Sequence, residues 1–174
     1  MKVKDERHKH SPTKIALVTG GFDPIHSGHI QYLKAAATYA DYLIVGLNSD
    51  EWLTRKKGRP FMPFEEREAI LNELLVVDEV ISFDDRDDTA CHAIEMVKHL
   101  YKDPFNNKFH KKIIFCNGGD RTAENIPEQE KFKGDEWVDF EFGVGGENKK
   151  NSSSWILEDY KNAKTIRNWG YCRV

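Results

Sequence analysis

The sequence predicts an α/β fold, with a sheet of about five mostly parallel strands and helices on both faces. Three observations predict it. Short apolar runs alternate along the chain with longer segments of helical periodicity. Most of these runs are apolar at successive positions, which is typical of strands buried on both faces of a parallel sheet. Glycine turns follow two of the runs, and ligands bind at the carboxyl ends of strands in such sheets.

The first half of the chain provides three strands. Residues 14–19 form an apolar run that ends at a glycine pair, and residues 41–47 and 79–83 are similar runs. A helix is expected over residues 29–40, where alanines and apolar residues recur at helical spacing. Ser49 or Asp50 can cap a short helix through residues 51–53, which a basic, glycine-containing loop at 56–60 should follow. Residues 64–75 form an amphipathic helix.

The pattern repeats in the second half. Residues 89–101 have helical periodicity, and residues 112–116 are a fourth strand that ends at a glycine turn. Residues 137–142 alternate as a fifth strand, and residues 152–162 are a helix that begins with serines. The polar segments between these elements are too short to divide the chain. We therefore expect one domain, residues 14–174, after a polar flexible tail at residues 1–13.

The composition is that of a globular protein, with 39% hydrophobic and 32% charged residues. No apolar run approaches the roughly 20 residues of a spanning helix, and the N-terminus lacks a signal-peptide core, so we expect a cytoplasmic protein. The net charge of −3 comes from 26 basic and 29 acidic residues spread along the chain. This charge pattern favours small phosphorylated partners over nucleic acid or membrane.

Residues 20–30 are the most informative segment. Gly20 and Gly21 leave room for a ligand, and the first N–H groups of the following helix have no partner inside it, so an anion can bind against the backbone. His26 and His29 lie close to the same point and can donate hydrogen bonds to a transferring phosphoryl group. The segment predicts charge stabilisation at phosphorus without a covalent intermediate.

This segment resembles the signature G-x-F-D-x-x-H-x-G-H of the cytidylyltransferase-like nucleotidyltransferases. The six matching positions are Gly20, Phe22, Asp23, His26, Gly28 and His29. The resemblance implies a Rossmann-like nucleotidyltransferase fold, attack of a substrate phosphate on the α-phosphorus of a nucleoside triphosphate, and release of pyrophosphate. It implies that Mg²⁺ accompanies the triphosphate. It assigns catalysis to the two histidines and nucleotide binding to the other four residues and to Gly21.

Three cationic residues are candidate phosphate clamps by the same resemblance. Lys56 and Lys57 lie where the family carries a lysine, and the sequence leaves open which of them contacts phosphate. Arg67 and Leu71 resemble the family's Arg-x-x-x-Leu helix. An exposed arginine that pairs with neighbouring acids is the alternative for Arg67.

The turn after the fourth strand resembles the family's Gly-Asp loop, which contacts the nucleoside part of the donor. It consists of Asn117, Gly118, Gly119 and Asp120. An ordinary turn would have the same composition, so this assignment has an alternative.

A serine cluster before the last helix resembles a family cluster whose hydroxyls bind phosphate together with the helix N–H groups. It consists of Ser152, Ser153 and Ser154. Helix capping without a ligand would also use serine.

The resemblance extends from residue 14 to about residue 162, and it is greatest to the adenylyltransferases that act on heptose 1-phosphate. Glycerol 3-phosphate cytidylyltransferases are similar through the first motif and the Arg67 helix. The chain lacks their Arg-Thr-x-Gly-Ile before the serines and has a lysine-bearing loop at 143–150. We therefore expect transfer of a nucleoside monophosphate from ATP or CTP to a sugar phosphate or polyol phosphate. The resemblance is compatible with a homodimer.

Several alternatives stay open at this stage. A nicotinate mononucleotide-type adenylyltransferase shares the first motif, and a non-catalytic nucleotide-binding regulator could share the fold. Zinc binding by His26 and His29 with His8 and His10 is disfavoured, because no cysteine or acidic residue at ligand spacing accompanies them.

Overall fold

The computed structural model describes residues 13–101, 111–119, 121–122, 124–146 and 152–163. Its sheet has five parallel strands in the order β3-β2-β1-β4-β5. The strands are β1 (Lys14–Gly20), β2 (Tyr42–Leu47), β3 (Glu79–Ser82), β4 (Lys112–Cys116) and β5 (Val138–Glu141). The expected α/β fold with five strands is confirmed, and every pairing within the described residues is parallel.

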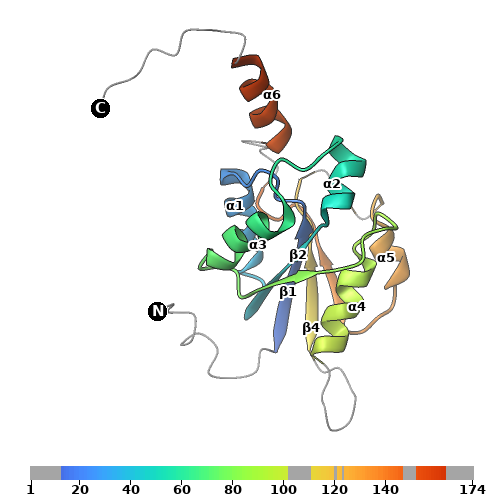
Figure 1. Ribbon diagram of the computed structural model, residues 1–174. Helices are drawn as coiled ribbons and strands as arrows, with labels where there is room; N and C mark the ends of the chain where they lie inside the picture. Colours follow the sequence, from blue (N-terminus) through green and yellow to red (C-terminus); the bar gives the residue numbers. More distant parts are fainter. Residues whose placement is uncertain (1–12, 102–110, 120, 123, 147–151, 164–174) are drawn as a thin grey trace.

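Helices cover both faces of the sheet (Figure 1). They are α1 (Ser27–Ala36), α2 (Asp50–Lys57), α3 (Phe64–Glu73), α4 (Cys91–Leu100), α5 (Pro127–Lys131) and α6 (Ser153–Ala163). One buried cluster joins Val18 of β1 to residues of α1 and α3. The other joins Leu17 of β1 to residues of α4 and to Phe132, the residue after α5. Successive β1 residues thus face opposite layers, which is why the strand is apolar throughout.

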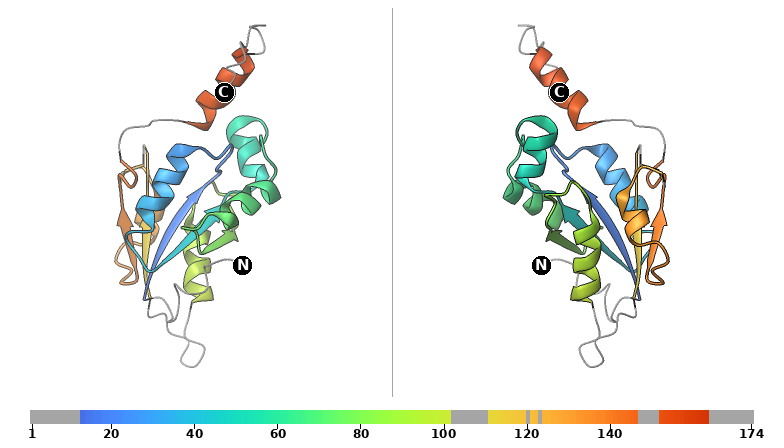
Figure 2. Two further views of the ribbon diagram at one scale, coloured as in Figure 1. Left: turned by 90° about the vertical axis from the view of Figure 1, so that its left-hand side faces the viewer. Right: turned by 90° about the vertical axis from the view of Figure 1, so that its right-hand side faces the viewer.

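The last helix, α6, stands away from the sheet, beyond the ends of the strands (Figure 2). Large side chains on it are half exposed, including Trp155 and Tyr160. No helix within the described ranges is long and apolar enough to cross a membrane.

The largest difference from the expected elements is in α2. Lys56 and Lys57 were expected in a loop, but they form the last turn of this helix, which ends at Gly58 with φ at 87°. Acidic residues in its first turn and cations in its last turn complement the helix dipole. The helix expected from the sequence ended at residue 53, because Leu53 is the buried apolar residue of α2. The short helix α5 was not expected, and α1 ends earlier than expected, at Ala36.

Candidate active site

The predicted motif lies between the carboxyl ends of β1 and β4. After β1 the chain builds the sheet outward through β2 and β3, and then α4 carries it back to β4 on the other side of β1. This reversal is a topological switch point, where open α/β sheets bind ligands. The motif at residues 20–29 and the turn at 117–119 therefore meet where a ligand is expected.

The backbone of the motif is closely packed against α2. A Cβ on Gly21 would lie 2.7 Å from Leu53 Cδ2, so any other residue there would have to displace the Leu53 side chain. Phe22 has a left-handed φ of 48° and a buried ring, which lies 5.0 Å from the His29 ring. Phe22 is thus a packing residue beneath His29, whereas the sequence placed it among the nucleotide contacts.

Asp23 is fully buried, and its carboxylate is occupied by protein groups. The two oxygens accept hydrogen bonds from the backbone N–H groups of Phe61 (2.7 Å) and Met62 (2.8 Å). The side chain therefore holds the segment between α2 and α3 against the motif. Its expected contact with the nucleotide is not supported by this geometry.

His26 is the N-cap of α1. Its Nδ1 accepts a hydrogen bond from the backbone N–H of Gly28 at 3.1 Å. A neutral His26 must then carry its proton on Nε2, which is free to donate. The rings of His26 and His29 are stacked, with centroids 3.8 Å apart and planes inclined by 23°. The structure thus brings together the two histidines that the sequence assigned to catalysis.

The surroundings of both histidines lower their pKa values and so favour the neutral forms. Burial, then the neighbouring charges of His26 and Lys57, lowers the pKa of His29 from 6.5 to about 3. Burial and the Lys57 charge also lower the pKa of His26. Neutral imidazoles can donate hydrogen bonds to phosphate through a ring N–H without adding two positive charges to the site. The buried Nδ1 of His29 has no hydrogen-bond partner among the described residues.

The structure separates the two candidate lysines. Lys57 Nζ donates to the Asp23 carbonyl at 2.7 Å, and its positive charge acts on both histidines. Burial lowers the pKa of Lys57, against the raising effect of Asp23. Lys56 Nζ instead lies over the Trp52 ring, 5.6 Å from its centroid. Lys57 is the lysine that belongs to the site.

Arg67 lies behind the site. It is 1% exposed, and its guanidinium donates to the carbonyls of Gly21 (2.8 Å), Asn48 (2.9 Å) and Met62 (3.1 Å). It also forms an ion pair with Asp50 at 2.6 Å. With four donor directions used inside the protein, Arg67 fixes the motif backbone to the start of α2. The sequence had suggested either an exposed arginine that pairs with nearby acids or a phosphate clamp. The buried guanidinium, bonded to these protein groups, fits neither description.

The turn after β4 is packed against α1. A Cβ on Gly118 would lie 2.9 Å from the Tyr32 ring and from the Val144 carbonyl oxygen. Gly119 has a positive φ of 68°. Asn117 is buried, and its Oδ1 has no partner among the described groups, which makes it available to a ligand or water. Asp120 lies outside the described residues.

The serine cluster meets the motif from the other side. Ser153 is buried, and its hydroxyl donates to the Pro24 carbonyl at 3.0 Å. Ser152 caps α6 by accepting the Trp155 N–H at 3.2 Å, and Ser154 is exposed. The structure thus brings the start of α6 to the histidine motif.

A protein-family model described as cytidylyltransferase-like matches residues 17–158. The chain belongs to this family. The family predicted from the histidine motif is therefore confirmed. The matched range includes the motif, Lys57, Arg67 and the serine cluster.

Several curated relatives of this cytidylyltransferase-like chain are called bifunctional protein HldE. The chain is 34% identical to the one from Pelobacter propionicus over 161 residues, which cover 89% of this chain and 29% of that protein. It is 44% identical to the one from Sulfurimonas denitrificans over 95 residues, 53% of this chain and 20% of that protein. The chain thus spans less than a third of the length of these relatives.

Solved structures share the fold. A lipopolysaccharide core biosynthesis protein from Thermoplasma volcanium has a TM-score of 0.52 and 26% identity, over 76% of this chain and 94% of that one. A bifunctional NMN adenylyltransferase/ADP ribose pyrophosphatase from Francisella tularensis has a TM-score of 0.54 and 19% identity. The latter match covers 86% of this chain and 42% of the other, and it shows the fold alone.

Two carboxylates that bind the elements around this site together were not recognised from the sequence. Asp50 pairs with Arg67, and Asp85, which is 3% exposed, accepts hydrogen bonds from Asn48 and Ser49. Asp85 belongs to an acidic run at residues 84–88 that resembles a solvated loop. The available signal was the position of Asp85 two residues after the buried Phe83, just beyond the carboxyl end of β3. The carboxyl ends of parallel strands meet at one edge of the sheet, where a ligand is expected.

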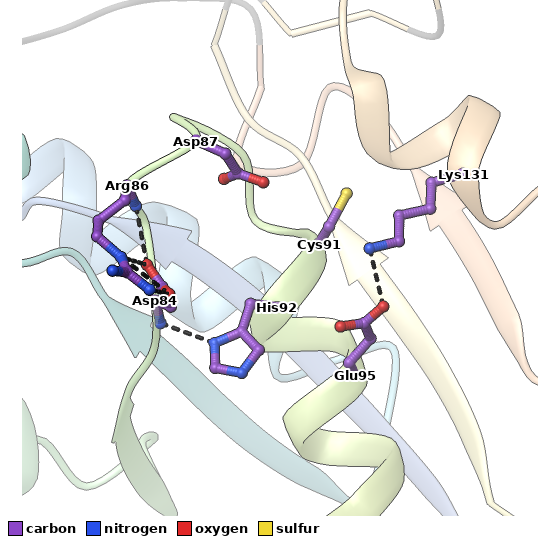
Figure 3. Close-up of a pocket in the computed structure, with 7 residues that line it drawn as sticks. All are labelled: Asp84, Arg86, Asp87, Cys91, His92, Glu95 and Lys131. Atoms are coloured by element: carbon purple, nitrogen blue, oxygen red, sulfur yellow. Dashed lines mark hydrogen bonds and ion pairs between the residues drawn. The ribbon is translucent and has the colours of Figure 1, made fainter.

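A second concavity lies near the start of α4 (Figure 3). This pocket of about 470 Å³ is lined by residues that include Asp84, Arg86, His92, Glu95 and Lys131. Arg86 pairs with Asp84, Lys131 pairs with Glu95, and His92 Nδ1 accepts the Asp84 N–H. Its cations are thus already paired, which distinguishes it from the phosphate-directed site at β1.

No group of three or more His, Cys, Asp or Glu side chains in the part of the chain described is arranged to hold a metal ion. The acidic residues near the motif are engaged by Arg67 or by backbone N–H groups. A divalent cation at this site would therefore be held chiefly by the phosphates of a bound triphosphate, as Mg²⁺ commonly is.

Proposed function

We propose that the protein transfers the adenylyl group of ATP to a phosphorylated sugar and releases pyrophosphate. The observation that carries this proposal is the stacked pair of neutral histidines beside Lys57 at the switch point of the sheet. The resemblance to heptose 1-phosphate adenylyltransferases, the HldE relatives and the lipopolysaccharide core biosynthesis structure support a sugar phosphate as the acceptor.

In the proposed reaction, an oxygen of the acceptor phosphate attacks the α-phosphorus of ATP. The new P–O bond forms as the bond from the α-phosphorus to the bridging oxygen breaks, and pyrophosphate leaves with the electron pair. The five-coordinate centre carries extra negative charge on its equatorial oxygens. Hydrogen bonds that strengthen as this charge develops lower the barrier.

The chain supplies the donors for this charge. Nε2–H of His26 is directed by the N-cap bond at Nδ1, and His29 is held against it by stacking on one side and Phe22 on the other. Lys57 adds a positive charge held at the Asp23 carbonyl. A divalent cation, for which we propose Mg²⁺, would neutralise the leaving pyrophosphate when bound with ATP.

The remaining loops have separate proposed roles. The backbone of Gly118 and Gly119 and the free Oδ1 of Asn117 would contact the nucleoside, together with Asp120. Ser152 to Ser154 and the N-terminus of α6 would bind phosphate. The polar flexible tail, the cytoplasmic location and the homodimer stay predictions.

Release of pyrophosphate tests the proposal directly. Purified protein with Mg²⁺ should be incubated with each of ATP, CTP, GTP and UTP against sugar 1-phosphates, glycerol 3-phosphate and nicotinamide mononucleotide. We expect pyrophosphate with ATP and a sugar phosphate, and a nucleoside diphosphate sugar among the products. Turnover with nicotinamide mononucleotide alone would contradict the acceptor, and no pyrophosphate in any combination would contradict the reaction. Tight ATP binding without turnover would identify a regulator.

A further inference from the structure

Asp85 connects a loop on one side of the sheet to the helix that carries Lys57. Its Oδ2 accepts the backbone N–H of Ser49 at 2.7 Å and Nδ2 of Asn48 at 3.1 Å, and its Oδ1 accepts the Ser49 hydroxyl at 2.8 Å. Ser49 in turn caps α2 by accepting the Trp52 N–H at 3.0 Å. The carboxylate thus completes the N-terminus of α2, where a negative charge is favourable.

The same loop holds α2 at a second point. Arg55, in the last turn of the helix, donates to the Asp85 carbonyl at 2.5 Å and pairs with Asp88 at 3.2 Å. The loop is itself fixed to α4, because the Asp84 N–H donates to His92 at 2.8 Å (Figure 3). Asp85 is therefore presented from a braced loop.

The other end of α2 reaches the catalytic residues. Its eight residues span about 12 Å as a rigid rod. Leu53 and Lys57 are four residues apart and so share one face, and Leu53 packs against Gly21 while Lys57 reaches the Asp23 carbonyl. A change in the position of the N-terminus of α2 would therefore move the Lys57 ammonium relative to His26 and His29.

We infer that Asp85 is a positioning residue, which sets the Lys57 ammonium against the histidine pair through Ser49 and α2. It touches no reacting atom in the proposed chemistry. Its effect passes through a buried chain of hydrogen bonds and one helix, and Arg67 provides a second brace at Asp50. The inference rests on the proposed function for its kinetic consequences, but its structural consequence can be measured without turnover.

The histidines themselves report the position of Lys57. The groups that face them are Phe22, the Lys57 ammonium and each other, and Lys57 also faces Asp23 and Arg67. Lys57→Met should raise the pKa of His26, because it removes a positive charge that lowers it. Asp85→Asn should raise that pKa as well, by letting Lys57 move away. The direct loss of a negative charge would have the opposite sign, so the direction separates the two mechanisms.

The test is a double-mutant cycle of Asp85→Asn and Lys57→Met, read by NMR titration of the histidine ring protons in the unliganded protein. We expect Asp85→Asn to raise the His26 pKa when Lys57 is present and to have little effect in Lys57→Met. Asp87→Asn, in the same loop and exposed, is the matched control, because the described contacts of Asp87 are with Thr89 and not with α2, and it should leave the titration unchanged. Equal shifts in both backgrounds, or a lowered pKa, would overturn the inference.

Kinetics and a second variant complete the test. Asp85→Asn should lower kcat about tenfold with little change in KM for ATP, and Asp87→Asn should not. If Asp85→Asn fails to fold, Ser49→Ala removes the hydroxyl that joins Asp85 to the Trp52 N–H, leaves the Asp85 carboxylate in place, and should raise the His26 pKa in the same direction. An inactive wild-type protein would contradict the proposed function and leave the titration to decide the role of Asp85.

Discussion

The two turns that meet at the switch point are stabilised by different forces. The turn after β1 is held by charged and polar side chains: Asp23 binds backbone N–H groups, and Arg67 binds backbone carbonyls. The turn after β4 is held by close packing, with Gly118 against Tyr32 and Val144. Polar and charged contacts thus fix the turn after β1, and steric packing fixes the turn after β4. Substitutions should therefore affect turnover most at β1 and stability or nucleotide fit at β4.

The strongest test of the β1 side removes the histidines. His26→Ala and His29→Ala should each lower kcat by about two to three orders of magnitude, the scale seen when one transition-state donor is lost. Pyrophosphate release measures the effect. His99→Ala, at the exposed end of α4, is the matched control and should retain activity. Wild-type rates in both histidine variants would remove the proposed mechanism.

Arg67→Met tests whether the β1 turn depends on its buried cation. The substitution leaves Asp50 without its partner and the Gly21 and Asn48 carbonyls without donors, so we expect a loss of about 3 kcal/mol in the free energy of unfolding. Urea denaturation measures it. An unchanged stability with a raised KM for ATP would instead support a phosphate clamp.

Lys57→Met and Lys56→Met compare two neighbours on one helix. Lys57→Met should lower kcat about 10- to 100-fold, because a hydrogen bond to a charged group contributes about 1.5–3 kcal/mol. Lys56→Met loses only a contact with Trp52 and should stay close to wild type. Steady-state kinetics distinguish them, and equal losses would show that the site does not favour Lys57.

On the β4 side, Gly118→Ala should act through volume. The added methyl must displace the Tyr32 ring or the Val144 carbonyl. We expect this overpacking to lower the free energy of unfolding by about 1–3 kcal/mol. Thermal unfolding measures the loss, and nucleotide binding by calorimetry should weaken with it. A stable variant with unchanged affinity would contradict the steric account of this turn.

The pH dependence of stability should depend on His29. The folded His29 has a pKa of about 3 against an ordinary value of 6.5, so between these values the unfolded chain binds a proton that the folded protein excludes. Stability should therefore fall as the pH decreases from about 6.5 towards 3. His29→Gln lacks this contribution and should lose stability less steeply, as measured by urea denaturation at several pH values.

Local sequence was sufficient for much of the fold. The strands were recognisable from the sequence, because a strand that is buried on both faces of a sheet needs apolar residues at successive positions. The elements that were misjudged have little apolar periodicity: α2 is stabilised by its cap and its charges, and α5 has five residues. Their formation depends on contacts such as that between Ser49 and Asp85, which are 36 residues apart.

Residue types at fixed local spacing were enough to predict the parallel sheet, the histidine motif and the family. Long-range contacts in the folded protein place the Lys57 ammonium beside the motif, bury Arg67 behind it and join Asp85 to the start of α2. Neighbouring helical residues point about 100° apart, and long-range packing alone fixes which of them faces the site. The charge of a side chain follows from its residue type, but the group that it pairs with depends on the fold.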